Sequence, residues 1–223
     1  MVTWWSSAST SDPPGPGMMR PTTRQLSERW KHERTSALEH ELVLAAQRPG
    51  APFPASPFGT TEAGLVDLRG VRLTTPIRYQ RATGVDLSDV TFADGASVTE
   101  SELEGCVLDR IDMRGVFVRR RFVGCSFVGA KLTGARLGGE FTDCDFSGAT
   151  LSRSVASGAR FERCTFTGAS LRAVMWTTRC VFDHCVFDGV ASFTGSVAGS
   201  VFIGSAPPDL SGCIVDHVQH EEG

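Results

Sequence analysis

The sequence lacks the usual marks of a membrane span, a secretory signal and a nucleotide site. It contains no run of eighteen apolar residues, the length that a membrane-crossing helix needs. Residues 1–17 show no basic n-region followed by an apolar h-region, so we expect no secretory signal. The glycine-rich motifs GxGxxG and the P-loop are absent, and no two cysteines form a CxxC pair. We therefore expect no membrane span, no cofactor and a cytoplasmic location.

Tyrosine is almost absent, with one residue against 14 phenylalanines and 24 glycines. Such a composition suits a backbone that turns often around a dry and narrow interior. The net charge of −3 points by itself to neither nucleic acid nor membrane. Because no export signal is found, we expect the 7 cysteines to be reduced thiols.

The chain divides into five regions by composition and periodicity. Residues 22–48 predict a helix, because Leu26 and Trp30 lie four apart, as do Leu38 and Leu42, with Thr22 or Thr23 as the cap. We interpret this helix as an N-terminal cap. The expected regions are 1–21, a disordered leader rich in Ser, Thr, Pro and Gly; 22–48, the helix; 49–62, a linker; 63–205, a repeat domain; and 206–223, a C-terminal cap or tail.

The repeat domain has a period of five residues. Phe127, Leu132 and Leu137 recur at this interval, and a small residue stands two places before each: Cys125, Ala130 and Ala135. A period of five fits neither a helix nor a strand. It predicts a solenoid, a chain that makes a short extended side, turns and repeats.

The cysteines indicate how many sides make one coil. They lie 19, 19, 20 and 21 residues apart, each two places before a bulky residue: Cys106, Cys125, Cys144, Cys164 and Cys185. Four pentapeptides therefore make one coil, and the five thiols should stack in one inward column, where buried thiols are inert. We expect about seven coils and a rod roughly 30–35 Å long at ~4.8 Å per strand.

The segments Ala130–Gly134, Cys144–Gly148 and Cys164–Gly168 follow the pattern A(D/N)LxG closely. In this they resemble the pentapeptide repeat family. The resemblance implies an all-β solenoid, a right-handed four-sided β-helix. It also implies a functional expectation, since the best-understood members are DNA-mimicking dimeric rods that bind DNA gyrase and confer quinolone or natural-product resistance.

The period slips at one corner of the predicted coil. Val118 to Phe122 and Leu137 to Phe141 are each one residue short, which places Arg120 where a small inward residue belongs. A buried guanidinium is improbable, so we expect a bulge that turns Arg119, Arg120 and Arg121 to solvent. They are either a recognition edge for an anionic partner or ordinary solvated side chains.

Charge is uneven along the repeats. An acidic stretch precedes a basic one that runs from Arg114 to Arg136, and bipolar surfaces favour protein docking over tracking of phosphates. The candidate partner-binding residues are Asp86, Asp89, Asp94, Glu100, Glu102, Glu104, Asp109, Asp112, Arg119, Arg120 and Arg121.

No catalytic or metal site is predicted. Cys180 and Cys185 fall at inward positions and His184 at an outward corner, which disfavours a shared zinc ion. The pair Asp183–His184 has no serine nucleophile or phosphate loop beside it. At the C-terminus Leu210, Ile214, Val215 and Val218 offer an apolar patch, which is either a lid or, as the family resemblance implies, a tail-to-tail homodimer contact.

Three functions remain open from the sequence. The first is a non-enzymatic protein-binding scaffold with an unidentified macromolecular partner. The second is a gyrase-binding DNA mimic, which the mixed charge of the repeats opposes. The third is a biosynthetic-pathway enzyme or accessory factor that uses a cleft near Trp176, Asp183 and His184.

Overall fold

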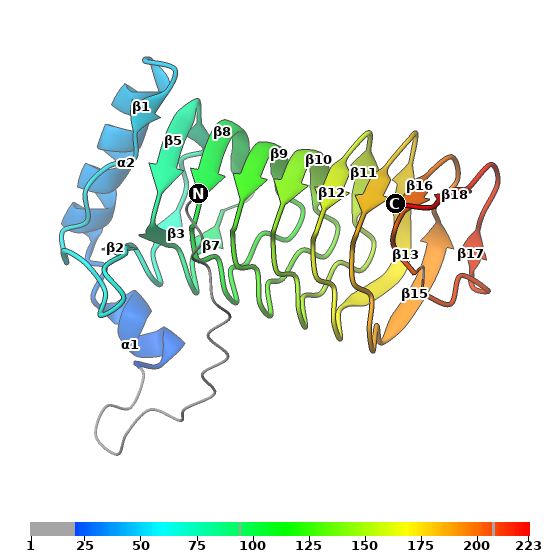
Figure 1. Ribbon diagram of the computed structural model, residues 1–223. Helices are drawn as coiled ribbons and strands as arrows, with labels where there is room; N and C mark the ends of the chain where they lie inside the picture. The colour runs from blue at the N-terminus through cyan, green and yellow to red at the C-terminus, as the bar shows by residue number, and fades with distance from the viewer. Residues whose placement is uncertain (1–20, 94, 207) are drawn as a thin grey trace, which may run out of the picture.

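The computed structural model describes residues 21–93, 95–206 and 208–223. The chain forms a rod of stacked coils with two helices packed against its N-terminal end (Figure 1). Apart from Pro21, the leader expected over residues 1–21 lies outside the described residues. None of the described helices is long and apolar enough to cross a membrane.

The helices are α1 (Thr23–Glu28) and α2 (His32–Ala46). The strands are β1 (Ala51–Pro52), β2 (Val66–Asp67), β3 (Arg72–Leu73), β4 (Ile77–Arg78), β5 (Gln80–Thr83), β6 (Val85–Asp86), β7 (Thr91–Phe92), β8 (Ser97–Glu104), β9 (Phe117–Val123), β10 (Arg136–Thr142), β11 (Val155–Ser157), β12 (Arg160–Glu162), β13 (Ser170–Thr177), β14 (Val181–Asp183), β15 (Ser192–Ser196), β16 (Val201–Ile203), β17 (Cys213–Ile214) and β18 (Gln219–Glu221).

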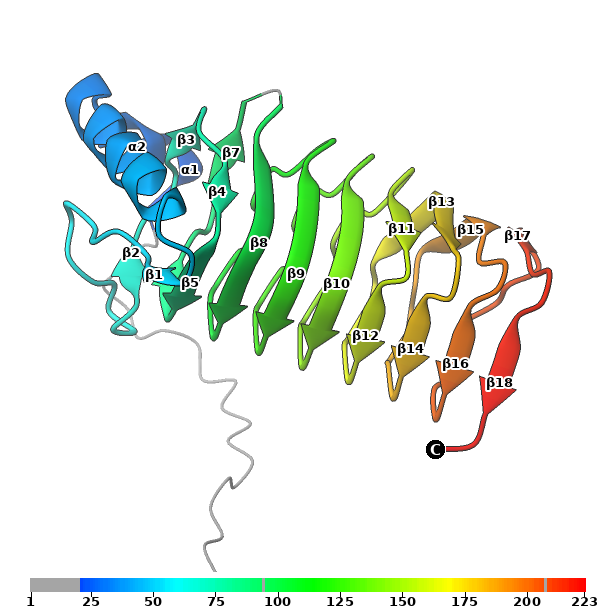
Figure 2. The same cartoon turned by 90° about the horizontal axis from the view of Figure 1, so that it is seen from above.

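Each coil pairs in parallel with the coils above and below it. One row of strands runs from β5 through β8, β9, β10, β12, β14 and β16 to β18, and a second row contains β11, β13, β15 and β17 (Figure 2). The expected all-β solenoid is confirmed, with about eight turns where the sequence predicted about seven. The additional turn comes from residues 206–223, because β17 pairs with β15 and β18 pairs with β16.

Four faces, A to D in chain order, are defined by their inward side chains. Face A is lined by Leu68, Leu87, Leu108, Phe127, Phe146, Phe166 and Phe187, and face B by Leu73, Phe92, Met113, Leu132, Leu151, Leu171 and Phe193. Face C is lined by Ile77, Val98, Val118, Leu137, Ala156, Trp176 and Val197, and face D by Ala82, Leu103, Phe122, Phe141, Phe161, Phe182 and Phe202.

Aromatic rings fill the interior in two columns. On face D the rings of Phe122, Phe141 and Phe161 stack with successive centroid distances of 5.0 and 5.0 Å, nearly parallel. On face A, Phe127 and Phe146 stack at 4.7 Å, and the two columns meet edge to face. Stacked and edge-to-face pairs each add about 0.5–1.5 kcal/mol beyond the burial of their area, so the repeat stabilises itself coil by coil.

The five thiols of the predicted cysteine column are all buried and unpaired as disulfides. The neighbours of Cys125 in the column are Cys106 and Cys144. Each thiol also donates to a backbone carbonyl of an earlier coil; for example, the sulfur of Cys164 lies 3.2 Å from the oxygen of Phe141. The column therefore fills the narrow corner between faces D and A.

The helix expected over residues 22–48 is interrupted at Arg29–Lys31. Thr22 caps α1 through a capping box with Gln25. At the interruption the Arg29 guanidinium makes two hydrogen bonds to Asp67, and the Trp30 indole donates to the Arg69 carbonyl at 2.8 Å. These contacts with the first coil turn the chain and explain why one amphipathic stretch forms two helices.

The two helices cover the open N-terminal end of the core. Leu38 and Leu42 of α2 are buried against Leu68 and other residues of the first coil. Helix α1 approaches so closely that a Cβ on Gly70 would lie 2.6 Å from the Cβ of Leu26, so only glycine fits there. This end of the rod is therefore closed by the two helices, with the short strand β1 paired in parallel to β5 at the edge of the sheet.

We predict that Arg29→Ala weakens the docking of α1 and α2. Burial opposes ionisation of Asp67, but hydrogen bonds from Arg29 and then Arg69 hold its pKa well below the usual value. Because this pKa is lowered in the folded state, the stabilisation should be complete at neutral pH. It should be lost as the pH falls below 3.8, the ordinary carboxyl value.

The measurement is hydrogen–deuterium exchange over residues 23–46. We expect Arg29→Ala to cost about 1.5–3 kcal/mol of local protection at pH 7, since a charged hydrogen-bonding partner of a buried carboxylate is removed. Arg24→Ala, which removes an exposed ion pair with Glu28, is the control and should change little. Equal effects of the two variants would show that the Arg29–Asp67 pair does not dock the helices.

Candidate partner-binding faces

The outward positions of a solenoid form columns, because the same position of each coil lies above its counterpart. On face D one such column alternates in charge, with each residue paired in register to the next: Arg81, Glu102, Arg121, Glu140 and Arg160. Arg81 binds Glu102 at 3.0 Å, and this hydrogen bond lowers the pKa of Glu102. Successive positions of this column thus alternate in sign, and Arg81 and Glu102 are ion-paired directly.

Faces A and B present mainly short polar side chains. The corresponding column of face A contains Asp86, Val107, Ser126, Asp145, Thr165 and Val186, and that of face B contains Arg72, Thr91, Asp112, Lys131, Thr150 and Ser170. These columns have no continuous apolar stretch.

Face C differs from the other three. One of its columns, read through the strand register, contains Ser97, Phe117, Arg136, Val155, Met175, Ser196 and Ile214. The exposed fractions are 48% for Phe117, 36% for Val155, 57% for Met175 and 64% for Ile214. Val215 continues this face at 47%. We call Phe117, Arg136, Val155 and Met175 the face C column.

Arginines border the face C column without acidic neighbours. Arg119 follows Phe117 by two residues in β9, and Arg153 precedes Val155 by two, so they flank the column on opposite sides. The Arg136 guanidinium lies over the Phe117 ring, 4.6 Å from its centroid. Among the described residues, no carboxylate lies within 4.0 Å of the side-chain nitrogens of Arg119, Arg136, Arg153 or Arg172. Face C is therefore apolar with unneutralised positive charge.

The acidic residues proposed from the sequence as partner-binding lie on several faces, and most of them are hydrogen-bonded or ion-paired within the chain. Asp86 and Asp89 are buried, at 9% and 6% exposed. Asp89 accepts from Thr23 of α1 at 2.8 Å and from Arg110 at 2.7 Å. Both carboxylates are thus covered and not presented to a partner. Asp94 lies outside the described residues.

The remaining acidic candidates are more accessible. Asp109 accepts from Ser126 and from the Val128 amide, and Asp112 binds Arg114 at 2.7 Å. Glu100 and Glu102 contact Arg120 at 3.6 and 3.3 Å, and Glu104 is exposed. Of these residues, Glu100, Glu102 and Asp112 are therefore paired with arginines.

As expected, the side chains of Arg119, Arg120 and Arg121 are all exposed, and the pairing with β8 is irregular beside them. The register of β8 and β9 shifts between Val98 and Ser101, because two residues of β8 lie opposite Arg119 alone, and Arg120 then pairs with the buried Ser101. Arg120 has φ 114°, a backbone conformation that side chains rarely adopt. In the next coil Gly139 occupies the equivalent place with φ 91°.

We predict opposite effects for two substitutions at this corner. Arg120→Gly should leave stability unchanged or raise it, because it relieves about 1–3 kcal/mol of backbone strain and removes exposed ion pairs worth about 0–1 kcal/mol. Gly139→Ala should destabilise the rod by about 1–3 kcal/mol, because its Cβ would lie 2.2 Å from the Arg120 carbonyl oxygen. Urea unfolding midpoints measure the stability of both variants. A clearly lower midpoint for Arg120→Gly would contradict the inference that the Arg120 backbone is strained.

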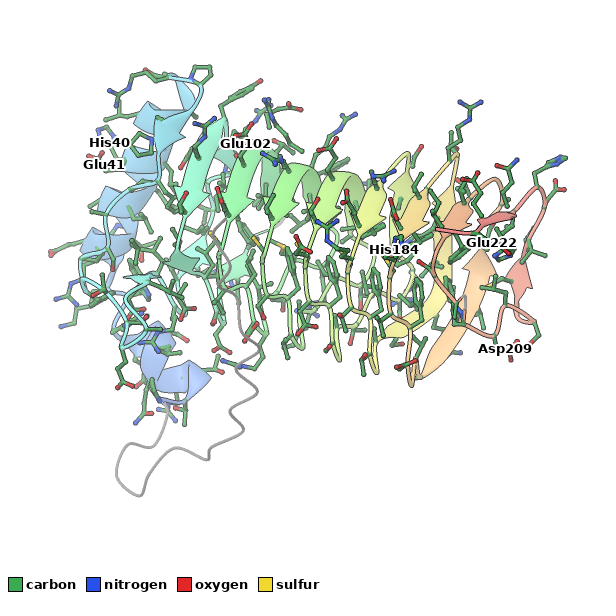
Figure 3. The ribbon with its side chains drawn as sticks, viewed as in Figure 1. His40, Glu41, Glu102, His184, Asp209 and Glu222 are labelled. Carbon is green, nitrogen blue, oxygen red and sulfur yellow. The ribbon has the colours of Figure 1, made fainter. Side chains whose placement is uncertain are left out.

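The candidate residues for a catalytic cleft or a metal site do not come together in the structure. Trp176 is fully buried, with its indole donating to Ser154, whereas His184 lies exposed at a corner beside Asp183 at 2.7 Å (Figure 3). Burial raises the pKa of the Cys180 thiol to about 11, which disfavours the thiolate that binds metals. In the described part of the chain no group of three or more His, Cys, Asp or Glu side chains is placed to hold a metal ion.

The C-terminal candidates separate into two pairs. Leu210 and Val218 pack against the core of the rod, while Ile214 and Val215 point outward and are exposed. The His220 ring stacks on Phe202 at 5.5 Å and extends the aromatic column by one coil. The last coil therefore ends the core, and its outer apolar side chains belong to face C.

Comparisons with known proteins found a family model and several solved structures. A family model described as pentapeptide repeats, with 8 copies, matches residues 140–174. No curated protein sequence matches the chain. Among solved structures, trypsin-treated QnrB1, a plasmid-mediated fluoroquinolone resistance protein, is 16% identical with a TM-score of 0.40, covering 70% of this chain and 82% of that chain.

Two further solved structures are similar over the same share of this chain. Full-length QnrB1 is 14% identical with a TM-score of 0.38, covering 70% of this chain and 91% of that chain. HetL of the cyanobacterium Nostoc sp. strain PCC 7120, a pentapeptide repeat protein involved in heterocyst differentiation regulation, is 18% identical. Its TM-score is 0.29, and the match covers 70% of this chain and 86% of that chain.

The stacked four-sided coils define a β-solenoid built from five-residue repeats. The resemblance to the pentapeptide repeat family is confirmed by the repeat match over residues 140–174.

Proposed function

We propose that the chain is a non-enzymatic protein-binding scaffold whose docking surface is face C. The observation that carries this proposal is the face C column, where Phe117, Val155 and Met175 are exposed side by side on consecutive or nearby coils. Grouped exposed apolar side chains rimmed by polar ones are typical of protein interaction sites. Aromatic residues, methionine and arginine are also the types enriched at such interfaces.

The hypothesis of a DNA-mimicking gyrase inhibitor finds less support. A DNA mimic requires a run of unpaired carboxylates along the rod, and here Asp89, Glu102 and Asp112 are ion-paired with arginines. Face C has the opposite charge. A DNA supercoiling assay with purified gyrase tests this narrower function directly, and inhibition at stoichiometric concentration would favour it over a general scaffold.

The hypothesis of a biosynthetic enzyme required a cleft shared by Trp176, Asp183 and His184. Trp176 points into the core and His184 away from it, so these side chains do not line one cleft. A hollow of about 250 Å³ lies beside Glu100, Glu102 and Arg120, but these charged groups pair with one another. We therefore favour binding over catalysis.

The scaffold proposal predicts that a partner contacts Met175. With a photo-crosslinking amino acid at position 175 of the full chain, we expect a discrete adduct in an extract of the source cells. The matched control is position 150, where Thr150 occupies the corresponding exposed column of face B. Phe117→Ala in the crosslinking chain should reduce the adduct. Equal adducts from positions 175 and 150 would exclude face C as a specific docking surface.

We propose further that two copies associate through the C-terminal coil, where Ile214 and Val215 are exposed. Light scattering should then give twice the mass of one chain. Ile214→Asp should shift the mass toward that of the monomer, because it places a charge on the apolar contact. Val186→Asp changes an exposed apolar side chain of face A and should leave the dimer intact. A monomeric wild-type chain at micromolar concentration would contradict this association.

A further inference from the structure

We infer that the segment bound by face C is an acidic amphipathic helix lying along the axis of the rod. This inference rests on the proposed function and names the class of partner. It combines two properties of face C: the spacing of its apolar side chains along the rod, and the unneutralised arginines on both sides of them.

The spacing of the coils favours a helix. Successive coils lie ~4.8 Å apart, and one turn of an α-helix advances ~5.4 Å. Over the three coil steps from Phe117 to Met175, the helix turns and the coils go out of register by only about 2 Å. Apolar helix residues at i, i+4, i+7 and i+11 can therefore each contact one coil. An extended peptide places same-side residues ~6.7 Å apart and would lose register after one coil.

The charges of face C select acidic flanks on that helix. Arg119 lies on one side of the column and Arg153 on the other, and Arg136 lies within it. The face C segments 97–99, 117–119, 136–138, 155–157, 175–177, 195–198 and 213–215 contain no aspartate or glutamate. Glutamates on both edges of an apolar stripe would therefore meet arginines and no carboxylate of these segments.

Other occupants fit this face less well. A second copy docking its own face C column onto this one would bring Arg136 and its neighbouring arginines against one another, which is electrostatically unfavourable. A nucleic acid would use the arginines but would leave Val155 and Met175 against phosphates. The leader of this chain, residues 1–20, has two tryptophans but a single acidic residue, Asp12, and so lacks the complementary charge.

The test uses a fluorescent helical peptide of about fourteen residues with leucines at i, i+4, i+7 and i+11 and glutamates on both flanks. Fluorescence anisotropy with the full chain measures its affinity, and circular dichroism measures helix formation on binding. We expect binding with a gain in helicity. A peptide with lysine in place of each glutamate should bind at least about tenfold more weakly, since several close charge pairs are reversed.

Variants of the chain separate the contributions of charge and apolar contact. Arg119→Glu with Arg136→Glu should weaken binding of the acidic peptide about tenfold. Phe117→Ala with Met175→Ala should also weaken it, because the apolar contacts are truncated. Lys131→Glu changes the charge of an exposed residue on face B of the coil that contains Arg136, and should leave the affinity within about twofold.

Three outcomes would overturn the inference. One is equal binding of a peptide with the same composition but a scrambled apolar stripe. Another is tighter binding of a single-stranded oligonucleotide that depends on Arg119 and Arg136 but not on Phe117. The third is a partner crosslinked at position 175 whose contact segment is neither helical nor acidic; the scaffold function would then stand while the helix assignment would fail.

Discussion

The vertical registry of inward side chains is the constraint on which this molecule depends. One coil of about twenty residues is too thin to enclose a core, so each inward side chain must be buried by its counterparts above and below. The near-parallel rings of Phe122, Phe141 and Phe161, 5.0 Å apart, show this requirement directly. Once the inward positions are fixed in this way, the outward positions are free to vary, and they carry the differences between the four faces.

Stacking also creates the problem of the two ends, since a bare coil exposes both strand edges and apolar side chains. At the N-terminus the problem is solved by α1 and α2, with Leu38 and Leu42 over the core and Arg29 bound to Asp67. At the C-terminus the stack simply continues through β17 and β18, and His220 covers Phe202. The two ends of the described rod are therefore covered in different ways.

The inward positions could be predicted from the sequence because they repeat at a nearly fixed interval. The cysteines from Cys106 to Cys185, for example, recur about once per coil. The split of the N-terminal helix could not, because it depends on contacts of Arg29 and Trp30 with residues some forty positions later. The face C column was missed for a different reason. Its members lie about twenty residues apart in the sequence. Residues that are close in the sequence lie on different faces, so grouping charges by sequence position does not bring Phe117 and Val155 together.

The sequence does contain the signal for that column. Phe117, Arg136, Val155 and Met175 each stand one place before an inward residue of face C, and aligning the chain by coil brings them together. The same alignment shows why the linear acidic stretch is no acidic patch: Asp86 lies on face A, Asp112 on face B and Glu102 on face D.

The three consecutive arginines show how one missing residue can shape the surface. Because the corner between faces C and D is short in this coil, Val118 and Phe122 are inward and everything between them is outward. Arg119 then lies on face C without a carboxylate partner, Arg120 takes a strained backbone at the corner and binds Glu100 and Glu102, and Arg121 joins the alternating charges of face D. A coil of regular length would have required a small residue at position 120. The shortened corner instead allows the charge of face D to be balanced while that of face C remains available to a partner.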